Sequence, residues 1–381
     1  MTPDLENARG LFDIPRETAY LNAAQMGPLP TVARIAGETA YGRKARPWLR
    51  TVQEDFFDTP EALRGLGAGL FGATPDDVAI IPAVSYGLAV AARNIQLQPG
   101  QDILVLDEQF PSNVYTWRRM AEREEARLVT VARRDGQSWT EALLGSIGPR
   151  TGLIACGALH WIDGGRVDLV AIGAAARAHG AKIVLDLTQS LGVMEFDIAE
   201  CDPEFAAAAG YKWMLGPYTL GLLYAAPRWR DGEPLEENWI NRERSEDFTR
   251  LIDYRDGYQP GARRFDMGER SNFQLIPSLI VSLKLLAGFG APAIAAHLAE
   301  TSAAIADAVK PLGLLADTPD RAPHYLALTL PHSAPSDLVA RLRARDVHVS
   351  QRGRRLRVGA HIYNDLTDVE RFVEAVRAEL T

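Results

Sequence analysis

Cysteine is scarce in this sequence: Cys156 and Cys201 are the only two among 381 residues. They form no CxxC pair and no metal-ligand spacing, which argues against a disulfide framework and against a cysteine-based metal centre. A chain of this length can build a large hydrophobic core and needs no covalent cross-links. We therefore expect no metal site and a reducing, cytoplasmic compartment.

Long hydrophobic runs and an excess of positive charge are also absent. No uninterrupted apolar stretch reaches the roughly 18 residues of a membrane-spanning helix, and the opening MTPDLENARGLFDIPRE lacks the basic and apolar regions of a signal peptide. The net charge is -8, with both signs mixed along the chain, whereas nucleic-acid binding needs a basic face. We expect neither a nucleic-acid partner nor membrane insertion.

The residues that are present have an ordinary globular balance, with 47% hydrophobic and 24% charged. Short apolar runs alternate with segments of helical spacing up to about residue 226, which predicts an α/β fold with a mainly parallel, helix-covered sheet. The expected strands lie within 78–84, 102–108, 127–132, 151–159, 181–187 and 221–226, and the expected helices within 85–96, 112–126, 138–147 and 168–180.

The pattern changes after residue 265, where two long helical segments precede short strands and further helices. We predict an N-terminal segment (1–20) that packs near the functional site, a large α/β domain (21–265) and a small C-terminal α+β domain (266–381). Residues 227–265 form a long polar stretch, and a stretch of that length in a compact chain is more often functional or interfacial than idle.

The run GAGLFG at 67–72 matches the G-x-G-x-x-G pattern of dinucleotide-binding sites. That fingerprint requires a strand before the glycines and a helix after them. Here the preceding residues have helical spacing, and the expected strand 78–84 follows. Because this order is reversed, we expect no nicotinamide or flavin site.

One lysine lies in unusual surroundings. Lys212 follows the alanine run 206–209 and Tyr211, and Trp213 comes next. Apolar surroundings remove water from an ammonium group, which lowers its pKa and makes the amine available as a nucleophile or base. Alternatively, the side chain extends to the surface from the end of an apolar strand.

Two further positions lie where predicted strands end. Ser85 and Tyr86 begin a predicted helix, where backbone N–H groups and a hydroxyl suit a phosphate, although Ser85 can equally serve as a helix cap. Asp186 ends a predicted buried strand, and Gln189 follows three residues later. Open α/β sheets bind ligands at this edge, although structural aspartates occur there too.

A cluster of arginines falls on a predicted strand of the C-terminal part. Arg357 is a natural bidentate partner for a carboxylate, whereas its neighbours Arg352, Arg354 and Arg355 fit a solvated strand face. Together with the lysine amine, the phosphate cradle and the carboxylate, such an arginine completes the set that pyridoxal phosphate requires for chemistry on an amino acid.

The chain resembles the class V aminotransferases, a family that includes cysteine desulfurases, selenocysteine lyases, isopenicillin epimerases and kynureninases. The resemblance covers nearly the whole chain, in the family's order and at similar spacing. It implies the pyridoxal-phosphate transferase fold of type I, with a seven-stranded sheet, and a homodimer with the active site at its interface. The matching blocks are YLNAAQMGPLP, AVSYGLA, EQFPSNVYTW, HWIDGGRVDL, VLDLTQSLG, GYKWMLGPYTLGLLY, RFDMGERSNFQ and RRLRVGAHIYND.

The resemblance implies catalytic and binding roles for individual residues. Lys212 would hold pyridoxal phosphate covalently, and Asp186 would pair with its pyridinium nitrogen; these two are the expected catalytic residues. Gln189 would approach the phenolic oxygen of the cofactor. Arg357 would bind the substrate carboxylate.

Other matching positions would contact the cofactor's phosphate and ring. Ser85, backbone amides at Tyr86, and Tyr211 would hold the phosphate. Phe110 falls where many relatives stack a histidine on the ring, so this chain lacks that acid or base and leaves proton transfer to Lys212.

Two more pairs complete the expected site. Ser271 and Asn272 fall in a segment that relatives extend across the dimer interface to the partner's phosphate. Asn22 and Trp161 lie in segments that we expect to face the side chain of the substrate. The polar stretch described above is a third candidate for that contact.

Departures from the family bear on the reaction. The loop 345–355 has no cysteine, so the persulfide-forming nucleophile of the desulfurases is absent, and Ala209, Gly210 and Tyr211 replace their Ser-x-His. We predict an enzyme that acts on an α-amino acid, with transamination as the lead reaction. Cleavage at Cβ of a sulfur, selenium or acyl substituent and epimerisation are alternatives, and a non-catalytic cofactor-binding relative is a further one.

Overall fold

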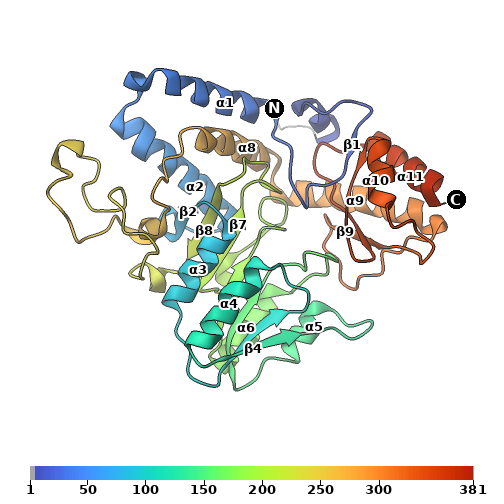
Figure 1. The fold of residues 1–381 in the computed structure, drawn as a ribbon, viewed down its shortest axis with the longest axis horizontal. Coiled ribbons are helices and arrows are strands. Elements are labelled where there is room, and N and C mark those ends of the chain that lie inside the picture. Colours follow the sequence, from blue (N-terminus) through green and yellow to red (C-terminus); the bar gives the residue numbers. More distant parts are fainter. Residues whose placement is uncertain (1–4, 381) are drawn as a thin grey trace.

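A seven-stranded sheet lies at the centre of the structure, a computed structural model that describes residues 5–380 (Figure 1). Its strand order is β2-β8-β7-β6-β5-β3-β4, and only β8 runs antiparallel to its neighbours. The predicted mainly parallel α/β sheet is therefore confirmed. The strands are β2 (Val78–Ile81), β3 (Asp102–Leu106), β4 (Arg127–Val131), β5 (Thr151–Cys156), β6 (Lys182–Asp186), β7 (Phe205–Ala209) and β8 (Gly221–Ala225).

Helices cover both faces of this sheet because alternate residues of each strand point to opposite sides. Ile80 and Leu104 pack into one apolar cluster, whereas their neighbours Ile81 and Val105 pack into another. The first cluster is completed by α2 (Thr59–Phe71), α5 (Trp139–Leu144), α6 (Leu169–His179) and α8 (Leu275–Phe289), and the second by α3 (Val84–Asn94) and α4 (Ser112–Arg123).

The C-terminal part has its own small sheet and core. Its antiparallel strands are β11 (Ser350–Arg352), β12 (Arg355–Val358) and β9 (Leu326–Thr329), and its helices are α9 (Ala291–Val309), α10 (Leu338–Ala344) and α11 (Leu366–Leu380).

The N-terminal residues join this C-terminal core, because β1 (Ala19–Tyr20) pairs in parallel with β10 (Val347–His348). The division into domains at residues 20 and 265 stays a prediction, and its residues 1–4 and 381 lie outside the described chain.

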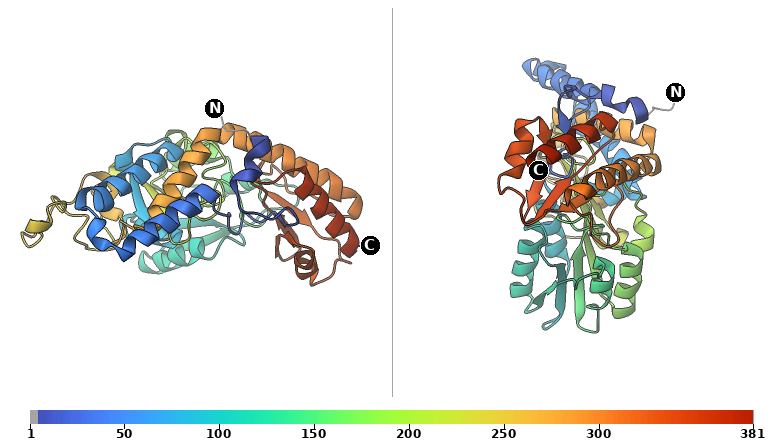
Figure 2. Two further views of the ribbon diagram at one scale, coloured as in Figure 1. Left: turned by 90° about the horizontal axis from the view of Figure 1, so that it is seen from above. Right: turned by 90° about the vertical axis from the view of Figure 1, so that its right-hand side faces the viewer.

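The long polar stretch has no strand or α-helix along residues 227–265, only 3₁₀ turns. It lies at the opposite end of the molecule from the C-terminal helices (Figures 1 and 2). The remaining elements are α1 (Thr31–Gly42), α7 (Ile198–Cys201), a π-helix (Val52–Asp58) and 3₁₀ turns at Leu5–Leu11, Arg43–Ala45, Pro47–Leu49, Pro75–Asp77, Pro227–Trp229, Phe248–Arg250, Gly261–Phe265 and Lys310–Leu312.

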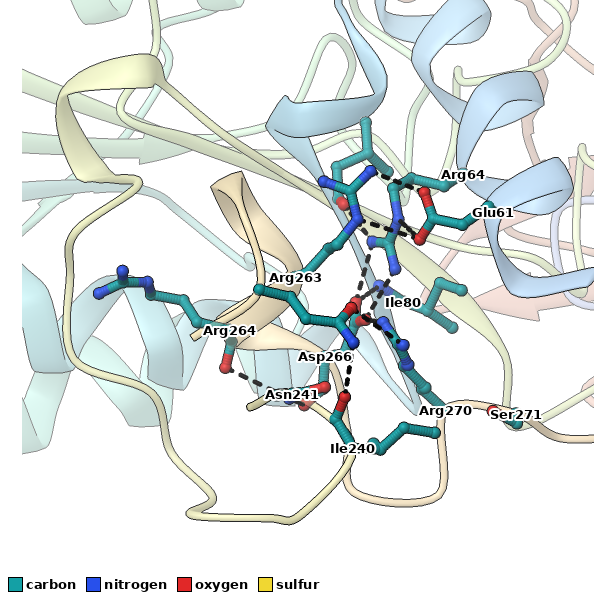
Figure 3. Close-up of polar contacts among 12 residues, drawn as sticks. Glu61, Arg64, Ile80, Ile240, Asn241, Arg263, Arg264, Asp266, Arg270 and Ser271 are labelled. Carbon is teal, nitrogen blue, oxygen red and sulfur yellow. Dashed lines mark hydrogen bonds and ion pairs between the residues drawn. The ribbon is translucent and has the colours of Figure 1, made fainter. Parts of the chain in front are cut away.

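A buried ionic cluster fastens the end of this stretch to α2 and β2 (Figure 3). The carboxylate of Asp266 accepts hydrogen bonds from Arg64 Nη2 at 2.7 Å, Arg270 Nη1 at 2.8 Å and the amide of Ile80 at 2.7 Å. The three charged side chains are fully buried. Asp266 therefore pairs with two guanidinium groups that have no access to water, and Arg64 also pairs with Glu61 at 2.9 Å.

The glycine-rich run 67–72 forms the end of α2 and its C-cap Gly72, and β2 follows it, which confirms the reversed order. Among the described residues, no single helix is long and apolar enough to cross a membrane. The segments Leu275–Phe289 and Ala291–Leu312 reach that length and apolarity only when they are taken together, and the chain bends by 80° between them.

Candidate active site

A cavity of about 340 Å³ opens at the carboxyl ends of the central strands, the edge at which open α/β sheets bind ligands. Its walls come from the loops that follow β2, β3, β5, β6 and β7. Of the residues singled out in the sequence, these line it: Ser85, Phe110, Trp161, Asp186, Gln189, Tyr211 and Lys212.

Lys212 lies on a tight loop between the antiparallel strands β7 and β8. The loop is closed by backbone hydrogen bonds from Gly210 to Leu220 and from Gly216 to Gly210, both 2.8 Å. Only 8% of Lys212 is exposed, and burial lowers the pKa of its amine to about 8. About one tenth of this amine is therefore uncharged at pH 7, far more than for an ordinary lysine.

Asp186, the last residue of β6, is the acid of the cavity. Its Oδ1 accepts a hydrogen bond from the amide of Thr188 at 3.0 Å. Burial raises the pKa of the carboxyl group, although the bonds from Thr188 and the positive charge of Lys212 act in the opposite direction. The cavity thus holds a carboxyl and an amine that influence each other's charge.

Gln189 is held in one orientation by two hydrogen bonds. Its Oε1 accepts from Trp213 Nε1 at 2.8 Å, and its Nε2 donates to the carbonyl of Ala24 at 3.1 Å. Because the tryptophan can only donate, it fixes which end of the amide is oxygen. The N-terminal segment and the loop after β7 therefore both position this amide.

Two buried histidines of the C-terminal part support the same tryptophan, and neither was predicted from the sequence. His324 donates to the carbonyl of Gln189 at 2.6 Å, and its ring lies 4.5 Å from that of Trp213. His361 donates to the carbonyl of Trp213 at 3.1 Å. Burial lowers the pKa of each histidine to about 4, so both are neutral at physiological pH.

Arg357 lies beside the cavity, 2% exposed, rather than in its lining. Its Nη2 donates to the carbonyl of Ala24 at 3.2 Å, and its Nε donates to the hydroxyl of Tyr325. The guanidinium carbon is 5.4 Å from the centroid of the Trp161 ring. Its positive charge contributes to the lowered pKa of Lys212.

Aromatic rings surround the lysine amine. The Nζ of Lys212 is 5.7 Å from the ring centroids of both Phe110 and Tyr211. Phe110 packs edge-on against Trp161 at 5.3 Å, and Tyr211 lies 4.6 Å from Tyr218. Tyr218 also lines the cavity and was not foreseen from the sequence.

The other predicted residues lie away from the cavity lining. The amide of Tyr86 donates within the first helical turn, and Asn22 lines a separate depression next to the strand that ends at Arg352. Ser271 and Asn272 line a third, small cavity, where the serine hydroxyl donates to the carbonyl of residue 56 at 2.8 Å. Their proposed contact is with a partner subunit, so these roles stay predictions.

The two cysteines are buried, and burial raises the pKa of the Cys201 thiol to about 12. Both also lie outside the lining of the cavity. Within residues 5–380, no group of three or more histidine, cysteine, aspartate or glutamate side chains could hold a metal ion.

Comparison with known sequences finds relatives over most of the chain. A family model described as Aminotransferase class-V matches residues 38–380. Isopenicillin N epimerase of Streptomyces clavuligerus is 27% identical over 398 residues, 98% of each chain. Kynureninase of Deinococcus radiodurans is 27% identical over 277 residues, which cover 69% of this chain and 64% of the kynureninase.

Solved structures share the fold. A C-DES variant with glycine covalently linked to its PLP cofactor matches 99% of both chains with a TM-score of 0.86 and 20% identity. The apo cysteine desulfurase of Thermococcus onnurineus NA1 matches 98% of this chain and 97% of its own, with a TM-score of 0.80 and 19% identity. At these identities the likeness concerns the fold alone.

Proposed function

Because the chain belongs to the class V aminotransferase family, we propose that it is a pyridoxal-phosphate-dependent enzyme that acts on an α-amino acid. The observation that carries the proposal is the nearly buried Lys212, whose amine has a pKa of about 8. It lines a cavity at the sheet edge together with Asp186, whose negative charge acts on this amine. Amines with pKa values of about 7 to 8 are suited to general-base work near neutral pH.

The groups around the cavity fit this cofactor. Lys212 offers an amine for its aldehyde, and Asp186 offers a carboxyl for its ring nitrogen. The helix α3 begins at the cavity wall, and the amides of Val84 and Ser85 at its start have no acceptor within the helix, so they suit a phosphate. When bound, pyridoxal phosphate supplies an electron sink that stabilises negative charge at the α-carbon of an amino acid.

The residues of this chain then have distinct tasks. Arg357 binds the substrate carboxylate through a charge-assisted hydrogen bond, which fixes the orientation of the α-carbon. Lys212 removes the proton from that carbon. The ionised carboxylate of Asp186 would stabilise a proton on the ring nitrogen of the cofactor, and the hydrogen bonds from Thr188 and the positive charge of Lys212 favour this ionised form against burial.

Transamination is the proposed reaction. Lys212 is the group in the cavity lining with a pKa near neutrality, because burial raises that of the neighbouring Tyr211 from its already high value. A single base that takes a proton from one carbon and returns it to another is sufficient for amino-group transfer. Phe110, at the position of a possible second base, cannot accept a proton.

Cβ elimination is the second candidate. The chain shares the fold of the cystine C-S lyase C-DES, which matches 94% of this chain with a TM-score of 0.85 and 20% identity. Elimination also needs one base, and it differs from transamination in that a group leaves from Cβ. Epimerisation requires a proton donor on the opposite face of the α-carbon, and Phe110 offers none.

Absorption and mass spectrometry test the proposal. We expect the purified protein, loaded with pyridoxal phosphate, to absorb visible light, to lose this band on borohydride reduction and to carry a pyridoxyl group on Lys212. Lys212→Ala removes the band, whereas Lys284→Ala, at an exposed site on α8, keeps it. A protein that cannot be loaded contradicts the proposal.

Product analysis separates the candidate reactions. Amino-group transfer to an added keto acid supports transamination, whereas released sulfide or ammonia supports elimination. We also propose that the protein is a homodimer, and light scattering of the same preparation tests this.

A further inference from the structure

The four arginines near the end of β11 and in β12 differ in how their charges are used. Arg355 forms an ion pair with Asp317. Arg354 donates to the carbonyl of Leu330 and contacts the ring of His332 at 2.7 Å. These two arginines therefore have structural partners at the edge of the small sheet.

Arg352 and Arg357 have no such counter-charge. Within residues 5–380, neither forms an ion pair with a carboxylate; Arg352 Nη1 donates to the carbonyl of Gln351 at 2.7 Å, and Arg357 donates to the neutral oxygens of Ala24 and Tyr325. Arg357 is almost fully buried, so its unneutralised charge is costly in the absence of an anion.

Both guanidinium groups face the same ring. The guanidinium carbons of Arg352 and Arg357 lie 5.6 Å and 5.4 Å from the centroid of Trp161, so they are within about 11 Å of each other. Antiparallel pairing of Ser350 with Arg357 also places Arg352, two residues along β11, on the same face of the hairpin. The two charges therefore point toward a shared region next to the cavity.

The electrostatics of this region favour an anion. The positive charges of Arg357 and Arg352 both help to lower the pKa of Lys212, and Asp186 is the opposing acid. Beyond Arg352 lies an open depression of about 650 Å³ that it shares with Asn22 and His348, and the lining of this depression contains no aspartate or glutamate.

We propose that Arg352 is a second substrate-binding arginine and that the substrate is an amino acid with an acidic group on its side chain. Arg357 binds the α-carboxylate, and Arg352 binds the side-chain acid; Trp161 packs against both guanidinium groups. This inference rests on the proposed function. A substrate with two carboxylates supplies one to each of the two unpaired guanidinium groups.

The first test uses carboxylates that lack an amine, so that it does not depend on catalysis. We expect calorimetric titration of the protein to show that glutarate, with two carboxylates, binds at least 10-fold more tightly than butyrate, with one. Loss of a charged hydrogen bond weakens binding about 10- to 100-fold. Arg352→Gln removes the preference for glutarate, and Arg355→Gln, whose charge is paired with Asp317, keeps it.

The second test uses matched amino acids with the cofactor-loaded enzyme. We expect the KM for glutamate to be at least 10-fold below the KM for its neutral isostere glutamine. Arg352→Gln is expected to raise the KM for glutamate and to leave the KM for glutamine unchanged. Equal binding of glutarate and butyrate, or an equal effect of Arg352→Gln on the KM values of both amino acids, overturns this inference but not the proposed function. A protein that prefers glutarate but turns over no amino acid overturns the proposed function instead.

Discussion

The amide of Gly27 donates to the carbonyl of Tyr211 at 2.9 Å, so the N-terminal segment lies directly against the loop that carries Lys212. A Cβ atom at position 27 would be 2.2 Å from the carbonyl oxygen of Lys212 and 2.9 Å from a side-chain atom of Leu215. Only glycine permits this approach of two backbones.

Gly27→Ala is therefore expected to displace the loop that carries Lys212. We predict a loss of stability of roughly 2 kcal/mol, because a contact this short with backbone requires the chain to move, and slower uptake of pyridoxal phosphate. Gly10→Ala is the matched control, since no atom lies within 4 Å of its Cβ. Urea denaturation and the visible band measure the two effects; equal behaviour of both variants contradicts the prediction.

The reactivity of the Lys212 amine depends on pH. In protein stripped of cofactor, labelling of this lysine by trinitrobenzenesulfonate is expected to rise as pH passes through about 8, well below the ordinary lysine value. Because the negative charge of Asp186 raises this pKa, Asp186→Asn moves the midpoint to lower pH. Arg352→Gln moves it upward, because it removes a positive charge. Peptide mapping gives the midpoint, and an ordinary lysine profile contradicts the prediction.

The ionic cluster at Asp266 makes a strong prediction about stability. Asp266→Ala leaves Arg270 buried without a carboxylate and leaves Arg64 with Glu61 alone, which costs about 3 to 5 kcal/mol. Asp231→Ala removes a carboxylate that is fully exposed and is expected to change stability by less than about 0.5 kcal/mol. Urea denaturation compares the two variants, and similar midpoints would show that the buried cluster contributes little.

The cysteines are expected to be unreactive in the folded protein. Cys156 and Cys201 are buried, and burial raises the pKa of both thiols, so little nucleophilic thiolate forms. We predict that dithionitrobenzoate labels neither residue until urea unfolds the chain. Fast labelling of native protein contradicts this prediction and reopens the question of a cysteine nucleophile.

Strand periodicity predicted six of the strands of the large sheet, but β7 was not among them. Its sequence FAAAA contains residues that are uncommon in strands. The structure gives a reason for the small side chains: a Cβ on Gly87 of α3 would lie 3.0 Å from that of Ala207. Close packing of helix on strand overrides the weak local preference of alanine.

The residues that follow strand ends were found from the sequence because a parallel sheet brings such ends together. Asp186 and Ser85 are examples, whereas Lys212 was found from its apolar neighbours, because the strand before it was not predicted. His324 and His361 could not be found in this way, because their contacts with Gln189 and Trp213 join residues more than 100 positions apart. Pairing of β1 with β10 is equally remote along the chain, and two-residue strands have no detectable pattern.

The wall formed by Trp213, His324 and His361 has a consequence for the length of acceptable substrates. It joins the loop of the amine to the part of the chain that carries Arg357, and each of its rings is fully buried. The span between amine and guanidinium is therefore set by rigid rings rather than by a hinge. If Arg357 binds the substrate carboxylate as proposed, this fixed span is expected to discriminate an α-amino acid from a β-amino acid, which carries an extra carbon between nitrogen and carboxylate.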